Sequence, residues 1–418
     1  MTEKQLKFDI AIVGGGPASI AAACAAAENG MTVAILEASP WLGGQLWRSE
    51  SLNPKTRQAK KWLGRLSRSS AKVFLNTTVI DAPVKNTLLA ETSDGNLRIV
   101  YDKLIIATGG REIFLPFPGW TLPNVYGAGA LLALAKDDWP VEGKRIAVAG
   151  SGPLLFSVAA NLRKMGAKIV LMAEQTDLAS FMRFGMKLPL LAPSKILQAA
   201  QYQSQLIGVP YKTSCWPVEA HGSEQLESIT FTNGGKTWKV DCDYLACAFG
   251  LTGNLELPRL LGCEIDSDVV SVDNYQQTSL KNVFCAGELT GIGGIDSALT
   301  EGRIAGLADA GKLEQAKGLL GTRERYTRFE KAMASGFALR KDLLKLATAE
   351  TIVCRCEDVT AGQLSEFDDW KSAKLQTRCG MGPCQGRICG CAVKAMFGWE
   401  NKSVRPPVYP AKMKNIIS

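Results

Sequence analysis

Two segments of this chain repeat one pattern: a short apolar strand, a glycine-rich turn, a helix and a second strand that ends in an acid. The turns read Gly14-Gly15-Gly16-Pro17-Ala18-Ser19 and Gly150-Ser151-Gly152-Pro153-Leu154-Leu155. Strand–turn–helix–strand units of this kind bind a dinucleotide, because the glycines let the backbone approach a pyrophosphate at the helix N-terminus. The repeat therefore predicts an α/β chain with two nucleotide-binding domains.

The first turn matches the dinucleotide fingerprint well. Gly14 permits the tight turn, Gly16 allows close approach of the phosphate, and Ser19 is small enough for the third-glycine position. Glu37 ends the second strand, where an acid can hydrogen-bond the ribose hydroxyls. The residues expected to bind the cofactor here are Gly14, Gly16, Pro17, Ala18, Ser19 and Glu37.

The second turn matches less well, because Leu155 occupies its third-glycine position. Glu174 ends the following strand, and an acid there favours a free ribose 2′-hydroxyl over a 2′-phosphate. Three interpretations stay open: a working NADH site, a site for another adenine nucleotide, and a domain kept only for packing. The residues that would bind the nucleotide are Gly150, Gly152, Pro153, Leu154 and Glu174.

Composition excludes several classes of function. The net charge of +8 is spread along the chain without a run of five basic residues, which argues against nucleic-acid binding. The apolar run 10–27 contains glycines and Pro17, so we expect neither a signal peptide nor a transmembrane segment. His221 is the single histidine, which disfavours nucleophilic catalysis through histidine. We assign no catalytic residue, and the chemistry must come from a cofactor or from carboxylate, lysine, tyrosine or cysteine groups.

Half of the twelve cysteines lie between residues 354 and 391. Cys354 and Cys356 form a C-x-C pair, and Cys384 and Cys389 form a C-x4-C pair that brackets a predicted helix start. Four thiolates can hold a [2Fe-2S] cluster or a structural zinc ion, and the lack of C-x2-C knuckles disfavours zinc. Cys379 also has C-x4-C spacing to Cys384, which leaves open whether it replaces Cys389 as a ligand. We prefer Cys384 and Cys389, and Cys379 is then a spare.

Several segments resemble the flavoprotein reductases of the glutathione and thioredoxin reductase fold, which have two dinucleotide-binding domains. The matching stretches are WLGGQ at 41–45, LIIATGGRE at 104–112 and NVFCAGELTG at 282–291. The resemblance implies FAD in the first site. It adds Gly44, Gln45, Val79, Thr108, Gly109, Gly287 and Glu288 to the expected cofactor-binding residues. Glu288 stands where that family usually has aspartate, and no redox-active cysteine pair is placed to face the flavin.

The cysteine segment resembles the [2Fe-2S] domain of bacterioferritin-associated ferredoxin. The whole chain resembles the FAD- and [2Fe-2S]-containing alpha subunits of multi-subunit amine and amino-acid dehydrogenases. This group includes subunits of hydrogen cyanide synthase and opine oxidase, and the alpha subunits of proline and hydroxyproline dehydrogenases. The stretches that carry this resemblance are GGGPAS, GGQLWR, ATGGRE, GSGPLL, AGELTGIGG, TIVCRCEDVT and RCGMGPCQGRICG.

The resemblance also implies an order of domains. We expect an FAD-binding domain from residues 1–118 and 270–312, an inserted NAD(P)-like domain at 119–269, a helical connector at 313–350, a small helical [2Fe-2S] domain at 351–400, and a proline-containing tail at 401–418.

A division of labour follows from the same resemblance. A separate flavoprotein beta subunit would oxidise an amino acid or secondary amine of the proline, hydroxyproline, opine or glycine type. This chain would relay the electrons through FAD and the cluster, in a hetero-oligomer that can include a small third subunit. A stand-alone NADH-dependent reductase and a non-catalytic scaffold with structural zinc are the alternatives. The scattered cysteines favour a reducing cytoplasm, with any membrane contact made through partners.

Overall fold

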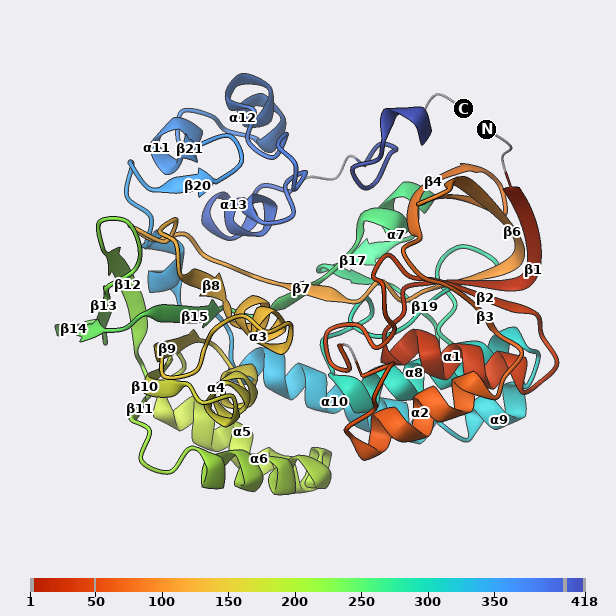
Figure 1. Ribbon diagram of the computed structural model, residues 1–418, viewed down its shortest axis with the longest axis horizontal. Coiled ribbons are helices and arrows are strands. Elements are labelled where there is room, and N and C mark those ends of the chain that lie inside the picture. Colours follow the sequence, from red (N-terminus) through yellow and green to blue (C-terminus); the bar gives the residue numbers. More distant parts are fainter. Residues whose placement is uncertain (1–3, 49, 401–403, 416–418) are drawn as a thin grey trace. The chain divides into compact units, whose positions relative to one another are not determined.

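The computed structural model, which describes residues 4–48, 50–400 and 404–415, divides the chain into two units (Figure 1). Unit 1 comprises Met1–Arg111, Thr252–Glu330 and Lys402–Ser418 as far as these are described, and unit 2 comprises Glu112–Leu251 and Lys331–Asn401. The chain passes from unit 1 to unit 2 within β7 (Gly110–Glu112) and returns within β16 (Leu251–Gly253), and these two strands pair with each other. The first segment of unit 2, Glu112–Leu251, overlaps most of the inserted domain that we expect at 119–269.

Unit 1 is built on a seven-stranded sheet in the order β3-β2-β1-β6-β5-β4, with β19 also pairing with β6. Pairing is parallel among β3, β2, β1, β6 and β19, and antiparallel where β5 joins β4 and β6. The strands are β1 (Lys4–Val13), β2 (Val33–Leu36), β3 (Lys72–Phe74), β4 (Thr78–Val84), β5 (Thr87–Thr92), β6 (Gly95–Ile106) and β19 (Val283–Cys285). Unit 1 also contains the short elements α7 (Glu256–Leu261), β17 (Ile265–Asp266), β18 (Val269–Val270), α9 (Leu313–Lys317) and η2 (Met413–Asn415).

Both faces of this sheet are buried, which explains the continuous apolar run of β1. Ile10 and Ile12 pack with α1 (Pro17–Ala27), α2 (Arg57–Ser67) and α8 (Ile295–Asp309), while Ala11 and Val13 join a second cluster on the other face. Figure 1 shows α1, α2 and α8 side by side along the sheet. Buried parallel strands read as apolar runs because successive side chains enter two different cores.

The helices α1 and α8 approach each other very closely. A Cβ built on Gly302 of α8 would lie 2.1 Å from the carbonyl oxygen of Ala18, and one on Gly306 would lie 2.3 Å from that of Ala22. The alanines of α1 supply the other small surface, and Ala21, Ala22 and Ala23 are fully buried. The alanine-rich sequence after the first turn therefore serves helix packing as well as helix propensity.

Unit 2 contains a five-stranded parallel sheet in the order β11-β10-β9-β15-β8. One face packs on α3 and α4, and the other packs against a three-stranded antiparallel sheet of β12, β13 and β14. The elements are β8 (Val125–Gly127), α3 (Ala128–Lys136), β9 (Arg145–Gly150), α4 (Leu154–Lys164), β10 (Lys168–Glu174), α5 (Leu178–Leu191), α6 (Pro193–Gln205), β11 (Tyr211–Lys212), β12 (Trp216–His221), β13 (Ser228–Thr232), β14 (Thr237–Asp241) and β15 (Tyr244–Ala248).

The cysteine segment folds within unit 2 as a small domain with its own core. Its elements are β20 (Ile352–Cys354), β21 (Val359–Thr360), α11 (Ala361–Leu364), α12 (Trp370–Thr377) and α13 (Cys389–Phe397). The indole Nε1 of Trp120 donates a hydrogen bond of 2.6 Å to the carbonyl oxygen of Ile352. The side chain of Arg355 lies over the same indole ring. Trp120 therefore joins the cysteine domain to the body of unit 2.

The expected connector, residues 313–350, is divided between the two units, and the described part of the expected tail belongs to unit 1. Helix α10 (Leu320–Gly336) spans the division between the units, and η1 (Lys341–Lys345) packs on unit 2 through buried Leu343. In the tail, the Val408 backbone N–H donates to the Ile80 carbonyl, and residues 401–403 and 416–418 lie outside the described residues. None of the described helices combines the length and the apolar composition that a membrane span requires.

Candidate functional site

The first glycine turn has a closed side and an open side. Gly14 has φ +107°, and a Cβ at this position would lie 2.3 Å from the carbonyl oxygen of Ala107. Apart from Gly16 itself and its two chain neighbours, no heavy atom of the described residues lies within 4 Å of the position that a Cβ on Gly16 would take. Gly16 precedes α1, whose first residue is Pro17. The turn therefore presents accessible backbone and a helix N-terminus, which together attract an anion.

Segments that are distant in the sequence converge on this turn. A Cβ on Gly44 would lie 3.2 Å from the Cα of Gly16, and one on Gly287 would lie 3.2 Å from the Cβ of Ala18. The alanines around this point form one buried cluster: Ala18, Ala107, Ala286 and Ala298. The turn, the WLGGQ segment and the ends of β6 and β19 thus lie together, and their binding of a cofactor stays a prediction.

Asn254 is a residue of this region that sequence reasoning missed. Its side-chain amide donates to the carbonyl oxygen of Thr108 at 2.8 Å, its carbonyl accepts from Thr108 Oγ1 at 3.0 Å, and its N–H donates to the Gly109 carbonyl at 2.9 Å. These three bonds fix the backbone after β6. No motif surrounds Asn254, so only the tertiary structure identifies it.

Two polar side chains at the turn suit a bound dinucleotide. The Glu37 carboxylate lies against the turn, since a Cβ on Gly15 would be 2.6 Å from its Oε2, and its Oε1 accepts from the Ser39 backbone N–H at 2.7 Å. Ser19 is fully buried, and its hydroxyl has no hydrogen-bond partner among the described residues. The open turn and this orphaned hydroxyl both fit a dinucleotide.

The remaining predicted residues of the first site differ in their placement. Gln45 follows Gly44 and is exposed to solvent. Val79 is buried in β4, where it pairs with Ala90 and packs in the sheet core. Its side chain therefore belongs to the core, and only its backbone is left to contact a cofactor.

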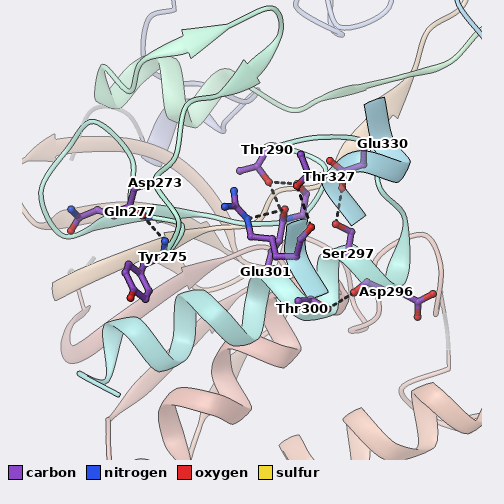
Figure 2. A network of polar contacts seen from close by, with 12 residues as sticks. Asp273, Tyr275, Gln277, Thr290, Asp296, Ser297, Thr300, Glu301, Thr327 and Glu330 are labelled. Atoms are coloured by element: carbon purple, nitrogen blue, oxygen red, sulfur yellow. Dashed lines mark hydrogen bonds and ion pairs between the residues drawn. The ribbon is translucent and has the colours of Figure 1, made fainter. Parts of the chain in front are cut away.

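A network of buried acids supports the loop after β19 (Figure 2). Glu301 of α8 accepts hydrogen bonds at its Oε2 from the Gly287 backbone N–H at 2.9 Å and from Thr290 Oγ1 at 2.7 Å. Glu330 of α10 accepts from Ser297 Oγ at 2.7 Å. The Nε of Arg323 lies 3.9 Å from the Oε1 of Glu301 and brings a positive charge to the network. The network fixes the loop that carries Glu288.

Burial dominates the electrostatics of these acids. It raises the pKa of Glu301 to about 8, and the nearby Glu330 adds to this effect. Burial also raises the pKa of Glu288 and that of Glu330. Sequence reasoning predicted Glu288 but missed Glu301 and Glu330. An acid among the buried small and apolar residues of α8, such as Ala298, Leu299 and Ile304, was the available signal, because buried acids are rare without a structural or functional reason.

The second turn repeats the backbone design of the first. Gly150 has φ +134°, and a Cβ at this position would lie 1.7 Å from the carbonyl oxygen of Ala248. Glu174 is fully buried and accepts hydrogen bonds from the backbone N–H groups of Gly152 at 2.7 Å and Thr176 at 2.9 Å. Burial raises the pKa of Glu174 to about 7, although these bonds oppose the shift. The Gly152 N–H thus donates its hydrogen bond to the Glu174 carboxylate.

Residues after α10 cover this second turn. The Phe337 ring lies 3.7 Å from the position that a Cβ on Gly152 would take, and the Phe337 carbonyl accepts from Ser151 Oγ at 3.1 Å. Gln175, which is fully buried, donates to Ser151 Oγ and to the Ala338 carbonyl. The Phe337 ring also packs edge-on against Phe184 of α5. The predicted residues of the second site are brought together, but a segment of the same chain lies over Gly152.

Five cysteine thiols gather in the small domain. The Sγ atoms of Cys354, Cys379 and Cys389 all lie within 4.8 Å of one another, and all three residues are buried. Cys384 is half-buried and hydrogen-bonds with Cys389 and with Cys356, which is exposed. The structure therefore brings the four predicted ligands together and adds Cys379 to them.

The thiol group has the character of a soft-metal site. Hydrogen bonds from Cys379 and then from Cys389 lower the pKa of Cys354 to about 2, and a hydrogen bond from Cys389 leads the causes that lower the pKa of Cys384 to about 5. Thiolates are the form in which cysteine binds metal. The buried three-thiol group is compatible with an iron–sulfur cluster.

Comparison with known proteins agrees with this geometry. An opine oxidase subunit of Rhizobium meliloti is 28% identical over 98% of this chain and 87% of its own length. Hydrogen cyanide synthase subunit HcnB of Pseudomonas protegens is 29% identical over 90% of this chain and 89% of its own length. The sequence resemblance to this group of proteins is confirmed.

Solved structures show the same fold. The crystal structure of L-proline dehydrogenase from P. horikoshii matches with a TM-score of 0.70 and 20% identity, covering 100% of this chain and 80% of that one. Thioredoxin reductase of T. acidophilum matches with a TM-score of 0.57 and 21% identity over 73% of this chain and 98% of its own. The predicted two-dinucleotide-domain fold is confirmed.

Residues 8–312 match the family described as pyridine nucleotide-disulphide oxidoreductase. This match covers both glycine turns and the strand ends that meet at the first of them. It implies FAD at the open first turn and makes the chain an oxidoreductase. The protein belongs to the pyridine nucleotide-disulphide oxidoreductase family.

Proposed function

We propose that this chain is the electron-transferring subunit of a multi-subunit dehydrogenase or oxidase that acts on an amino acid or a secondary amine. A partner flavoprotein subunit carries the substrate site, and a small third subunit can complete the hetero-oligomer. The relatives named as subunits of opine oxidase and of hydrogen cyanide synthase support this assignment.

The observation that carries the proposal is the difference between the two glycine turns. The first is open at Gly16, whereas the second has the Phe337 ring over Gly152 and the Glu174 carboxylate on its N–H. A pyridine nucleotide would need that same backbone for its pyrophosphate. Electrons therefore enter from a partner and not from NADH, which disfavours the stand-alone reductase.

The chain's own residues have defined tasks in this proposal. The first turn binds the pyrophosphate of FAD at the N-terminus of α1. The Glu37 carboxylate accepts hydrogen bonds from the ribose hydroxyls. Glu301 accepts a hydrogen bond from the Gly287 N–H and so fixes the loop that carries Glu288. Cys354, Cys356, Cys384 and Cys389 hold a [2Fe-2S] cluster. FAD exchanges electrons in pairs or singly, and a [2Fe-2S] cluster exchanges one at a time.

An anaerobic reduction experiment tests the proposal. The purified chain, loaded with FAD, is mixed with NADH or NADPH, and the flavin absorbance is followed. We expect no rapid loss of the flavin band. The co-purified complex with its partner flavoprotein should lose the band when proline, hydroxyproline, glycine or an opine is added. Rapid bleaching of the isolated chain by NADH would instead establish the stand-alone reductase.

Metal content distinguishes the remaining alternative. The proposal expects iron and acid-labile sulfide in the purified chain, together with an EPR signal after reduction by dithionite. Zinc in the cysteine domain without iron would favour a structural role for the four thiolates. That result would remove the electron relay even if FAD were bound at the first turn.

A further inference from the structure

The cysteine domain holds more thiols in one place than a [2Fe-2S] cluster requires. Such a cluster takes four cysteine ligands, two for each iron. Five thiols, those of Cys354, Cys356, Cys379, Cys384 and Cys389, form one connected group. One of them is therefore in excess.

The excess lies on the buried side of the group. Thiolates that share one metal ion with bonds of about 2.3 Å in tetrahedral geometry are roughly 3.8 Å apart. The three Sγ atoms of Cys354, Cys379 and Cys389 all lie within 4.8 Å of one another, so any two of them can bind the same ion after small movements. Cys356 and Cys384 are the pair left for the second ion.

The fold holds Cys379 in this place. Helix α12 ends at Thr377, and Arg378 reverses the chain with φ +65°. The Arg378 Nε donates at 2.7 Å to Glu357, which follows Cys356 in the sequence. A Cβ on Gly380 would lie 2.9 Å from the Trp370 ring, so the backbone after Cys379 is packed against the domain core. Cys379 is fully buried and is not part of a loose loop.

We infer that Cys379 is a replacement ligand, which can take the position of Cys389 on the iron–sulfur cluster. This inference rests on the proposed cluster. In a chain without the Cys389 thiol, the Cys379 thiol releases its proton to solvent and its thiolate forms the iron–sulfur bond that Cys389 would have made. No change of oxidation state is involved. The replacement is specific, because Cys379 hydrogen-bonds with Cys354 and Cys389.

Matched serine variants test the inference in the full-length, FAD-loaded chain. Iron and acid-labile sulfide are measured for each chain, and EPR spectra are recorded after reduction with dithionite. We expect C389S to keep more than half of the wild-type iron with shifted EPR g-values. The variant C384S lacks the other thiol of the same C-x4-C pair, and we expect its iron content to be at least ten-fold lower than that of the wild type. The double variant C379S/C389S should lose as much iron as C384S does.

The controls make each outcome decisive. Cys391 is near in sequence and half-buried, so C389S/C391S should behave as C389S alone if Cys379 is the replacement. Equal loss of iron in C389S and C384S would overturn the inference, as would loss in C389S/C391S but not in C379S/C389S. A wild-type chain without iron would instead overturn the proposed function.

Discussion

At the residue scale, Glu301 shows how this fold uses a buried acid. The residue is buried in α8, and its carboxylate accepts hydrogen bonds from the Gly287 N–H and the Thr290 hydroxyl of the loop that carries Glu288. Burial raises its pKa to about 8. The acid therefore orders the loop and lowers the stability of the folded chain once it must ionise.

The pH dependence of stability should reveal this residue. With a folded pKa near 8 and an unfolded value near 4.5, the folded chain binds more protons between these pH values. The free energy of unfolding should therefore fall as pH rises from about 5 to 8. In the neutral variant Glu301→Gln this decrease in the free energy of unfolding should be smaller, by on the order of 1 to 3 kcal/mol, because one pKa unit corresponds to about 1.4 kcal/mol.

Urea unfolding of both proteins at pH 6, 7.5 and 9 measures the difference. Glu314 is an exposed glutamate of α9, and Glu314→Gln should follow the wild-type profile. A Glu301→Gln profile that runs parallel to the wild type at all three pH values would contradict the assigned burial effect.

At the element scale, the two glycine turns separate what the sequence could predict from what it could not. Gly14 and Gly150 have positive φ, a local backbone conformation that favours glycine, so the sequence indicates it directly. The contact of Ser151 with Phe337 joins residues 186 positions apart, and no local pattern encodes it. For the same reason the sequence did not indicate Asn254, Glu301 or the approach of Cys379 to Cys354 and Cys389. It did indicate the fold class, whereas the roles of the first site and of the two cysteine pairs stay predictions.

The packing of α1 on α8 gives a stability prediction at this scale. A Cβ on Gly306 would lie 2.3 Å from the backbone oxygen of Ala22, so Gly306→Ala must separate the two helices. We expect a loss of about 1 to 3 kcal/mol in the free energy of unfolding. Bound FAD should fall as well, because α1 begins at the first glycine turn.

Gly321 of α10 is the matched control, because in the described part of the chain no heavy atom outside its own helix turn lies within 4 Å of its Cβ position. Gly321→Ala should leave stability unchanged or raise it by about 0.5 to 1 kcal/mol through helix propensity. Urea midpoints and flavin content of the two variants check both statements. Equal midpoints for the two variants would show that the close helix contact carries no special cost.

At the scale of the whole molecule, the chain contains two turns of the same backbone design with different surroundings. In unit 1 the turn is open, and the ends of β6 and β19 meet beside it. In unit 2 the segment that covers the turn continues through η1 into the cysteine domain. The nucleotide-binding part of unit 2 thus contacts the cysteine domain through Trp120, and the chain between them packs on it through Leu343 and the segment around Phe337.

This difference predicts opposite responses to two dinucleotides in one protein. Adding FAD to the flavin-free chain should raise its melting temperature, since a ligand at one hundred times its Kd adds about 2.7 kcal/mol to stability. Adding NADH or NADPH at millimolar concentration to the FAD-loaded chain should leave the melting temperature unchanged, because Phe337 and Glu174 occupy the second turn. A saturable rise with NADH would show that the segment after α10 moves aside, and the argument for entry of electrons from a partner would then lose its basis.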